Sequence, residues 1–411
     1  MDEEAWVRHA PRLLRWAPSC AESEAHVAAY LVSLGAADER AARGAAASAS
    51  GLGVYLDRVS PEDVAWLRSQ RDVALMQAAA RTAEGGDTSC EVVLLAPQRA
   101  LRDLVADAAA DSSLSVALRL LLERAAQRTF TLHTTPQLTL TRGAPAIMGI
   151  VNVTPDSFSD GGEHVSPEAA VAHALELVEQ GAQILDVGGE STRPGAQPVD
   201  EEQEAARVLP VIAELATRLN GTVPLSVDTM KPAVARRAVE AGASLINDVG
   251  GFRDPAMVAV AAEFDLPVCC MHMQGKPRTM QQAPHYERDV VAEVDAFLRE
   301  RTAALLEAGI AREQMVLDPG FGFGKTVAHN FTLLRRLDEL TTLGQPVLAG
   351  LSRKSSLAAI SDQAPPQERL PESLAAHVVA AQHGVSILRV HDVAETRKAL
   401  AVLRAVNRPD E

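Results

Sequence analysis

The amino-acid sequence predicts an α/β protein in which a (β/α)8 TIM barrel follows a small α/β N-terminal domain. From residue 130 onward, short apolar runs alternate eight times with amphipathic segments, and such a barrel usually takes about 250 residues. A polar or charged residue lies at or just beyond the carboxyl end of each run. In a barrel these ends surround one mouth. A doubly wound sheet, the alternative fold, rarely carries eight successive and evenly spaced units.

The expected strands are continuous apolar runs, which are typical of parallel sheets buried on both faces. A hairpin comes first, formed by Phe130–His133 and Leu138–Leu140 around a Thr-Pro turn. The eight barrel strands are expected at Ala146–Val153, Ile184–Val187, Pro224–Asp228, Leu245–Asn247, Pro267–Met271, Met315–Asp318, Pro346–Gly350 and Ile387–Val390.

Amphipathic segments between these runs predict helices. One opens at Pro167, and others are expected at Glu202–Leu219, Pro232–Ala241, Asp289–Ala308 and Leu374–His383. Glycines stand where helices must end before the next strand, namely Gly181, Gly242, Gly309 and Gly384. Residues 129–411 are therefore expected to form one barrel domain that carries the catalytic site.

Residues 1–128 are Ala-rich and are expected to form a separate α/β accessory domain whose role the sequence does not reveal. The expected strands are Gly53–Leu56 and Glu91–Leu95, and the expected helices are Ala21–Leu34, Pro61–Ser69, Gln98–Ala109 and Leu114–Gln127. Ala41–Gly51 is of low complexity and is either a helix or a linker. The sequence of this part contains no evident metal cluster, nucleophile or phosphate loop. We therefore expect a packing or oligomerisation module rather than a second enzyme.

Composition excludes several classes of protein. The net charge of −15 argues against nucleic acid or an anionic membrane surface as a partner. No apolar stretch reaches the roughly 20 residues that cross a bilayer, and Met1–Glu4 is acidic, unlike the start of a secretory signal. The four cysteines lack the spacing of a zinc site or a disulfide framework, which favours a reducing cytoplasm.

The polar groups at the predicted mouth indicate what it binds. Ile147–Gly162 begins as an apolar strand and changes into a loop of polar and turn-forming residues, where α/β proteins place their chemistry. Acids and an amide follow four other strands, namely Asp186, Asp228, Asn247 and Asp318. Such groups suit a flat heterocycle whose N–H donors form paired hydrogen bonds. Arg193, Lys354 and Arg389 suit a phosphate or pyrophosphate, so the set favours binding and charge stabilisation over covalent catalysis.

Eight motifs occur in order along the barrel segment. They are Asn152–Gly162 (NVTPDSFSDGG), Gly188–Gly195 (GGESTRPG), Ser226–Thr229 (SVDT), Asn247–Val249 (NDV), Met271–Gly275 (MHMQG), Asp318–Lys325 (DPGFGFGK), Ser352–Ser355 (SRKS) and Arg389–Asp392 (RVHD). In sequence, order and spacing they resemble the motifs of the dihydropteroate synthases of the folate pathway. The resemblance covers about residues 130–408 and departs from the family at no motif position.

The resemblance implies an enzyme that joins (7,8-dihydropterin-6-yl)methyl diphosphate to 4-aminobenzoate, giving 7,8-dihydropteroate and diphosphate. The catalytic residues that it implies are Asp186, Lys354 and Arg389. The implied pterin-binding residues are Asp228, Asn247, Met271, Asp318 and Lys354. The implied diphosphate-binding residues are Thr192, Arg193, Arg389 and His391. The implied aminobenzoate pocket, which would also accept sulfonamides, consists of Phe158, Thr192, Pro194, Phe323, Lys354 and Ser355. Asn152 is implied as a ligand of a Mg²⁺ cofactor.

Two alternative functions use part of the same set of residues. A pterin-dependent methyltransferase has a similar barrel and the same pterin-binding acids, but it has no diphosphate or aminobenzoate to hold. Asn152–Gly162 and Ser352–Ser355 therefore favour the synthase. A catalytically silent pterin-binding paralogue would normally show broken motifs, and none is broken here. The resemblance also implies small-molecule substrates and a homodimer that pairs through the last helices.

Overall fold

The computed structural model of the chain describes residues 2–15, 52–70, 72–78, 81–82, 88–96, 98–107, 112–154, 166–191, 197–277 and 279–408. The chain divides into two compact units, Met1–Gln127 with Thr342–Gly344 and Arg128–Thr341 with Gln345–Glu411. Among the described residues, no helix combines the length and apolar character needed to span a membrane.

The first unit contains an antiparallel sheet with the strand order β1-β2-β5-β3, and β4 pairs with β5. The strands are β1 (Arg12–Arg15), β2 (Leu52–Val59), β3 (Ala74–Gln77), β4 (Arg81–Thr82) and β5 (Thr88–Leu95). The helices are α1 (Asp2–His9), α4 (Pro61–Ser69), α5 (Gln98–Asp107) and α6 (Ser113–Ala126). The strands expected at Gly53–Leu56 and Glu91–Leu95 lie within β2 and β5. The segments Ala21–Leu34 and Ala41–Gly51 lie outside the described residues.

The second unit is a parallel eight-stranded barrel with the strand order β13-β12-β11-β10-β9-β8-β15-β14. Its strands are β8 (Ala146–Asn152), β9 (Ile184–Gly188), β10 (Leu225–Asp228), β11 (Leu245–Asp248), β12 (Val268–Met271), β13 (Met315–Asp318), β14 (Leu348–Ala349) and β15 (Ile387–Val390). A parallel bridge between Leu317 and Val347 joins the two ends of this order. The sheet therefore closes on itself, and the predicted TIM barrel is confirmed.

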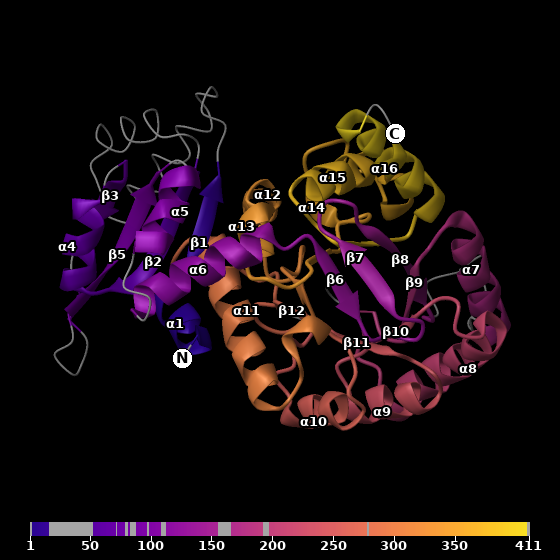
Figure 1. Cartoon of the computed structure of the whole chain (residues 1–411). Helices are drawn as coiled ribbons and strands as arrows, with labels where there is room; N and C mark the ends of the chain where they lie inside the picture. Colours follow the sequence, from indigo (N-terminus) through magenta and orange to yellow (C-terminus); the bar gives the residue numbers. More distant parts are fainter. Residues whose placement is uncertain are drawn as a thin grey trace. The chain divides into compact units, whose positions relative to one another are not determined.

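Helices follow the strands and cover the outside of the barrel. In Figure 1, α7 to α11 lie one after another around the strands. The helices are α7 (Pro167–Gln180), α8 (Glu201–Leu219), α9 (Pro232–Glu240), α10 (Pro255–Glu263), α11 (Val290–Glu307), α12 (Val327–Arg335), α13 (Leu337–Thr341), α14 (Ser355–Ala358), α15 (Leu370–Gln382) and α16 (Val393–Asn407), with short 3-10 turns at Arg312–Gln314 and Pro366–Glu368.

Local sequence explains where these helices begin and end. At α7, the Ser166 side chain accepts a hydrogen bond from the Ala169 N–H, and Pro167 occupies the first turn. The helix ends at Gly181, whose φ of 111° lies in the left-handed region that favours glycine. The predicted bounds of α8, α9 and α11 agree to within one residue, whereas α15 begins four residues before the predicted Leu374.

One end of the barrel is filled by apolar side chains. The hairpin of β6 (Thr129–Leu132) and β7 (Leu138–Thr141) is antiparallel, as expected. Its buried residues form a cluster with residues near the amino ends of the barrel strands, namely Phe130, Leu132, Leu138, Leu140, Ala146, Met148, Ile184, Leu245, Cys269, Val316, Leu348 and Ile387. This packing seals the amino end of the barrel and leaves the polar residues at the carboxyl ends of the strands.

Candidate active site

Asp186 on β9 is the central charged group at the carboxyl end of the barrel. Its side chain is 0% exposed. It accepts hydrogen bonds from Ser226 Oγ at 2.6 Å, Asn247 Nδ2 at 3.0 Å and Arg389 Nε at 2.6 Å. These donors come from β10, β11 and β15, so one carboxylate connects four strands. A buried charge is costly unless it is paired and hydrogen-bonded, and Asp186 meets both conditions.

Arg389 joins this carboxylate to the next acid. Its Nη2 donates to Asp228 Oδ2 at 2.6 Å while its Nε donates to Asp186. Burial raises the pKa of Asp228 to about 7, Arg389 opposes this rise, and the nearby charge of Asp186 adds to it. A guanidinium has five N–H donors, and the two acids accept only one each. The 20% exposed side chain of Arg389 therefore retains donors for a further anion.

Asp318 at the end of β13 supplies a third acid. Its side chain is buried, and its Oδ1 accepts the Gly320 N–H at 2.7 Å. Burial raises the pKa of Asp318 to about 6, against the effects of that hydrogen bond and of Lys354 and Lys325. Gly320 has a φ of 68°, and a Cβ there would lie 1.9 Å from the backbone oxygen of His272. Only glycine fits this turn, which packs the loop after β13 directly against the backbone at the end of β12.

An apolar wall lies beside these polar groups. The buried side chains of Met271 and Phe323 pack in one cluster with Val249, Met273 and Met280. Lys354, at the N-cap of α14, places its Nζ 4.3 Å from the centroid of the Phe323 ring. A cation over an aromatic face is attracted by the electron-rich ring. The loops after β13 and β14 are thereby connected at the mouth.

Polar contacts also connect the loops after β14 and β15. Ser352 Oγ lies 2.9 Å from His391 Nδ1 and accepts the His391 N–H at 3.2 Å. Arg353 donates to both carboxylate oxygens of Asp392, at 2.5 and 3.0 Å. These contacts hold the loops after β14 and β15 together, so they fix the position of His391, two residues beyond Arg389 in the chain.

A model of the pterin-binding enzyme family matches residues 148–391 of the chain. The chain is 52% identical over 261 residues to the dihydropteroate synthase of Escherichia coli K12, a match that spans 64% of this chain and 91% of the relative. The chain belongs to the dihydropteroate synthases of the pterin-binding enzyme family. The family predicted from the motifs is confirmed.

Other relatives of this dihydropteroate synthase agree. The enzyme of Haemophilus influenzae is 49% identical over 64% of this chain and 94% of its own length. Among solved structures, Xanthomonas albilineans dihydropteroate synthase with 4-aminobenzoic acid matches with a TM-score of 0.64 and 53% identity, covering 68% of this chain and 98% of that one. The same enzyme with 7,8-dihydropteroate matches with a TM-score of 0.61 and 51% identity, over 67% of this chain and 98% of that one. These relatives favour the synthase over the methyltransferase and the silent paralogue.

The remaining predicted residues of this dihydropteroate synthase are more scattered. Asn152 is half-buried at the end of β8, beside Gly188 of β9 in the parallel register. Ser355 is exposed at the first residue of α14. Phe158, Thr192, Arg193 and Pro194 lie outside the described residues. The structure thus brings together Asp186, Asp228, Asn247 and Arg389 by direct hydrogen bonds, and it places Asp318, Met271, Phe323 and Lys354 beside one another.

A buried lysine of the synthase, Lys325, was not among the predicted site residues. Lys325 Nζ lies 2.9 Å from His272 Nδ1 and donates to the Phe323 oxygen at 3.1 Å. Burial lowers the pKa of Lys325 to about 7 although Asp318 opposes this, and burial together with Lys325 lowers the pKa of His272 well below its usual value. The lowered pKa of His272 favours the neutral imidazole, which can accept a hydrogen bond at Nδ1. The only sequence signal was the position of Lys325 at the end of the DPGFGFGK motif.

Proposed function

We propose that this dihydropteroate synthase holds the pterin ring among Asp228, Asn247 and Asp318 and the diphosphate beside Arg389 and His391. The enzyme condenses (7,8-dihydropterin-6-yl)methyl diphosphate with 4-aminobenzoate to give 7,8-dihydropteroate and diphosphate. The observation that carries the proposed roles is the hydrogen-bonded set in which Arg389 joins Asp186 to Asp228, because it places the acids and the cation at one mouth.

The proposed pterin subsite uses acids to accept the ring's N–H and amino hydrogens. The Asp318 side chain is buried and that of Asp228 is only 13% exposed, so a hydrogen bond to either is formed with little competition from water. Asn247 is held in position by its bond to Asp186. Met271 packs against the ring, and Lys354 contacts its other edge. The apolar wall at Met271 and Phe323 excludes water from one side of this subsite.

The proposed diphosphate subsite combines Arg389 and His391 with Thr192 and Arg193. As the C–O bond of the methylene breaks, negative charge grows on the leaving diphosphate, and these cationic and polar groups stabilise it. The pterin methylene that remains is cationic and delocalised. The Asp186 carboxylate favours this cation electrostatically.

The residue Asn152 fits a role as a Mg²⁺ ligand. Mg²⁺ prefers oxygen ligands and is usually held by one or two protein groups together with substrate phosphates and waters. Asn152 has an amide oxygen and lies half-buried at the end of β8. When bound, the ion would neutralise charge on the diphosphate.

The proposed aminobenzoate pocket contains Phe158, Thr192, Pro194, Phe323, Lys354 and Ser355. The amine of 4-aminobenzoate is already nucleophilic, so its lone pair attacks the cationic methylene once the diphosphate has left. The C–N bond forms, and the nitrogen then loses a proton to solvent. The Lys354 ammonium, held over Phe323, suits the carboxylate of 4-aminobenzoate. Sulfonamides carry the same ring and amine and are expected to compete.

The activity test measures consumption of 4-aminobenzoate by the full-length enzyme. We expect consumption only when the pterin diphosphate and Mg²⁺ are both present, with diphosphate released in equal amount. The pterin alcohol, which lacks a leaving group, is the matched control. Consumption with the alcohol, or undiminished consumption after removal of Mg²⁺ with a chelator, would contradict the proposed chemistry.

Pterin affinity is expected to fall with acidity because burial raises the pKa of Asp228 to about 7 and that of Asp318 to about 6. An acid with a raised pKa is ionised above that pKa and takes up a proton as the pH falls through it. A carboxyl oxygen that carries a proton is a donor and cannot accept a hydrogen bond from the pterin ring. Calorimetric titration at pH 8.5, 7.0 and 5.5 is expected to show progressive weakening. An affinity that stays constant over this range would exclude the carboxylates as the ring's acceptors.

We also propose that the enzyme is a homodimer that pairs through α16. Val402 and Val406 are 66% and 71% exposed and lie four residues apart, so they share one face of this helix. The double variant Val402→Glu/Val406→Glu is expected to sediment as a monomer in analytical ultracentrifugation. The control Ile360→Glu, which replaces another exposed apolar residue, is expected to leave the dimer intact. A monomeric unmodified enzyme would refute the proposal.

The cytoplasm is the proposed location of the enzyme. Cys269 and Cys270 on β12 are free and buried, and free thiols persist in reducing compartments. Cell fractionation is expected to recover the protein with cytoplasmic markers, and recovery with the membrane fraction would contradict this.

A further inference from the structure

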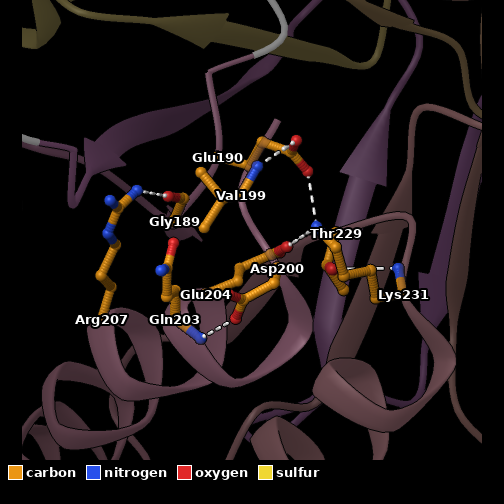
Figure 2. Close-up of polar contacts among 9 residues, drawn as sticks. All are labelled: Gly189, Glu190, Val199, Asp200, Gln203, Glu204, Arg207, Thr229 and Lys231. Atoms are coloured by element: carbon orange, nitrogen blue, oxygen red, sulfur yellow. Dashed lines mark hydrogen bonds and ion pairs between the residues drawn. The ribbon is translucent and has the colours of Figure 1, made fainter. Parts of the chain in front are cut away.

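Lys231 bridges two carboxylates, Glu190 and Glu204, that take no part in the proposed substrate contacts. Lys231, at the N-cap of α9, donates from Nζ to Glu190 Oε2 at 2.6 Å and also to Glu204 Oε2. Glu190 lies just beyond β9, and Glu204 lies on α8. Figure 2 shows these side chains together at the base of the loop that follows β9. The ammonium therefore joins the ends of two strands to a helix.

Glu190 also fixes the far end of that loop. Its Oε1 accepts the Val199 N–H at 3.1 Å. The Glu190 carboxylate therefore ties residue 199, where the loop ends, to residue 190, where it begins. Arg207 of α8 donates from Nη1 to the Gly189 oxygen at 2.8 Å. A Cβ at Gly189 would lie 2.8 Å from Val208 Cγ1, so the backbone packs directly on α8. Both ends of the loop are thus anchored.

The charge of this cluster is negative, because two carboxylates share one ammonium. Glu204 is 0% exposed, and its Oε1 has no hydrogen-bond partner among the residues that the structure describes. Glu190 and Lys231 are 15% and 22% exposed. A negative cluster repels an anion, so it cannot assist diphosphate binding by direct attraction. Any contribution that it makes to diphosphate binding must come from geometry.

We propose that Glu190 and Lys231 are positioning residues: they fix residues 190 and 199, the two described ends of the loop after β9, and diphosphate binding depends on this anchorage. This inference rests on the proposed diphosphate roles of Thr192 and Arg193. Neither Glu190 nor Lys231 touches the substrate. Glu190 holds the Val199 N–H, and Lys231 holds Glu190 in place.

The variant Glu190→Ala separates positioning from electrostatics by the sign of its effect. Removing a negative charge near the mouth would strengthen diphosphate binding if Coulomb forces alone decided it. If the role of Glu190 is to position the loop, its removal weakens diphosphate binding instead. The variant leaves Lys231 and Glu204 as a one-to-one ion pair, so it strands no buried charge and the fold is expected to persist, as checked by thermal unfolding.

Calorimetric titration of the full-length enzyme with the pterin diphosphate and with the pterin alcohol provides the test. For Glu190→Ala we expect about 10- to 100-fold weaker binding of the diphosphate, the usual scale of effect when a group that orients a ligand-binding residue is removed, and unchanged binding of the alcohol. Glu190→Gln, which keeps an acceptor for Val199, is expected to show a smaller loss. The control Glu202→Ala removes an exposed carboxylate of α8 that pairs with Arg237 and is expected to leave both affinities unchanged.

Further variants separate this inference from the proposed function. Lys231→Arg keeps the cation and is expected to retain most of the diphosphate affinity. Arg193→Ala tests the diphosphate role itself. If Arg193→Ala weakens diphosphate binding and Glu190→Ala does not, the positioning role is wrong and the proposed function stands. If Arg193→Ala has no effect, the diphosphate assignment is wrong and the positioning role falls with it. Tighter diphosphate binding by Glu190→Ala overturns the inference directly.

Discussion

The variant Asp228→Asn is expected to bind pterin about 2–3 kcal/mol more weakly, roughly 30- to 150-fold, because a charge-assisted acceptor is replaced by a neutral amide. The amide nitrogen of asparagine is a hydrogen-bond donor, so it faces a donor of the pterin ring and one of the two hydrogen bonds to the ring is lost. Calorimetric titration with the pterin alcohol measures this loss without any contribution from the diphosphate. Unchanged affinity would exclude Asp228 from the pterin subsite.

Loss of folding does not account for this expected effect. Folding raises the pKa of Asp228 from 3.8 to about 7, so ionising it costs folding free energy as the pH rises through that window. At pH 8 a neutral amide avoids this cost, and the variant is expected to be at least as stable as the unmodified enzyme. The matched control is Asp254→Asn, since Asp254 caps α10 and asparagine caps equally well. It is expected to bind pterin normally.

The variant Arg389→Met is expected to lose about 3–5 kcal/mol of stability at pH 8, as is typical when one partner of a buried ion pair is removed. The change leaves Asp186 and Asp228 without their shared cation. The variant is also expected to bind both pterin and diphosphate more weakly. The guanidinium holds Asp228, which is proposed to bind pterin, and is itself proposed to contact the diphosphate. Catalysis is expected to fall by about 100- to 1,000-fold, the usual effect of removing one charge-stabilising donor.

The pH dependence of unfolding identifies the cause of this loss. Arg389 opposes the raised pKa of Asp228, so without Arg389 the Asp228 carboxyl takes up a proton more readily, which removes its uncompensated charge at low pH. Urea unfolding is therefore expected to show a smaller stability deficit at pH 5.5 than at pH 8. The control Arg299→Met breaks a buried ion pair with Asp295 on α11, away from the mouth. It is expected to lose stability but to keep its turnover rate well below its melting temperature. An equal deficit at both pH values in Arg389→Met would contradict the ion-pair explanation.

The sequence predicted the barrel strands well because strand formation depends on local pattern. Met315–Asp318 and Ile387–Val390 have the predicted bounds, and β9 extends one residue past its prediction. Each polar residue at the carboxyl end of a strand could be placed at the mouth, since a closed parallel barrel brings all such ends to one side. The order of the motifs then identified the family.

The pairings within the site could not be predicted from the sequence. Arg389 was expected at the diphosphate, yet its nearest partners are acids 203 and 161 residues earlier in the chain. Glu204 lies on an amphipathic helix and gave no sign of its complete burial. Lys231 was outside every quoted motif. These contacts depend on which loops the closure of the barrel brings within hydrogen-bond distance.

The sequence by itself determined the strands, most of the helices, the family and the types of group at the mouth, because periodicity, turn residues and motif order are encoded over short stretches of chain. Only the tertiary structure decided that Arg389 joins Asp186 to Asp228 and that Lys231 joins Glu190 to Glu204. The reason is physical: a hydrogen bond between side chains requires atoms within about 3 Å, and that proximity arises when a long chain closes into a barrel.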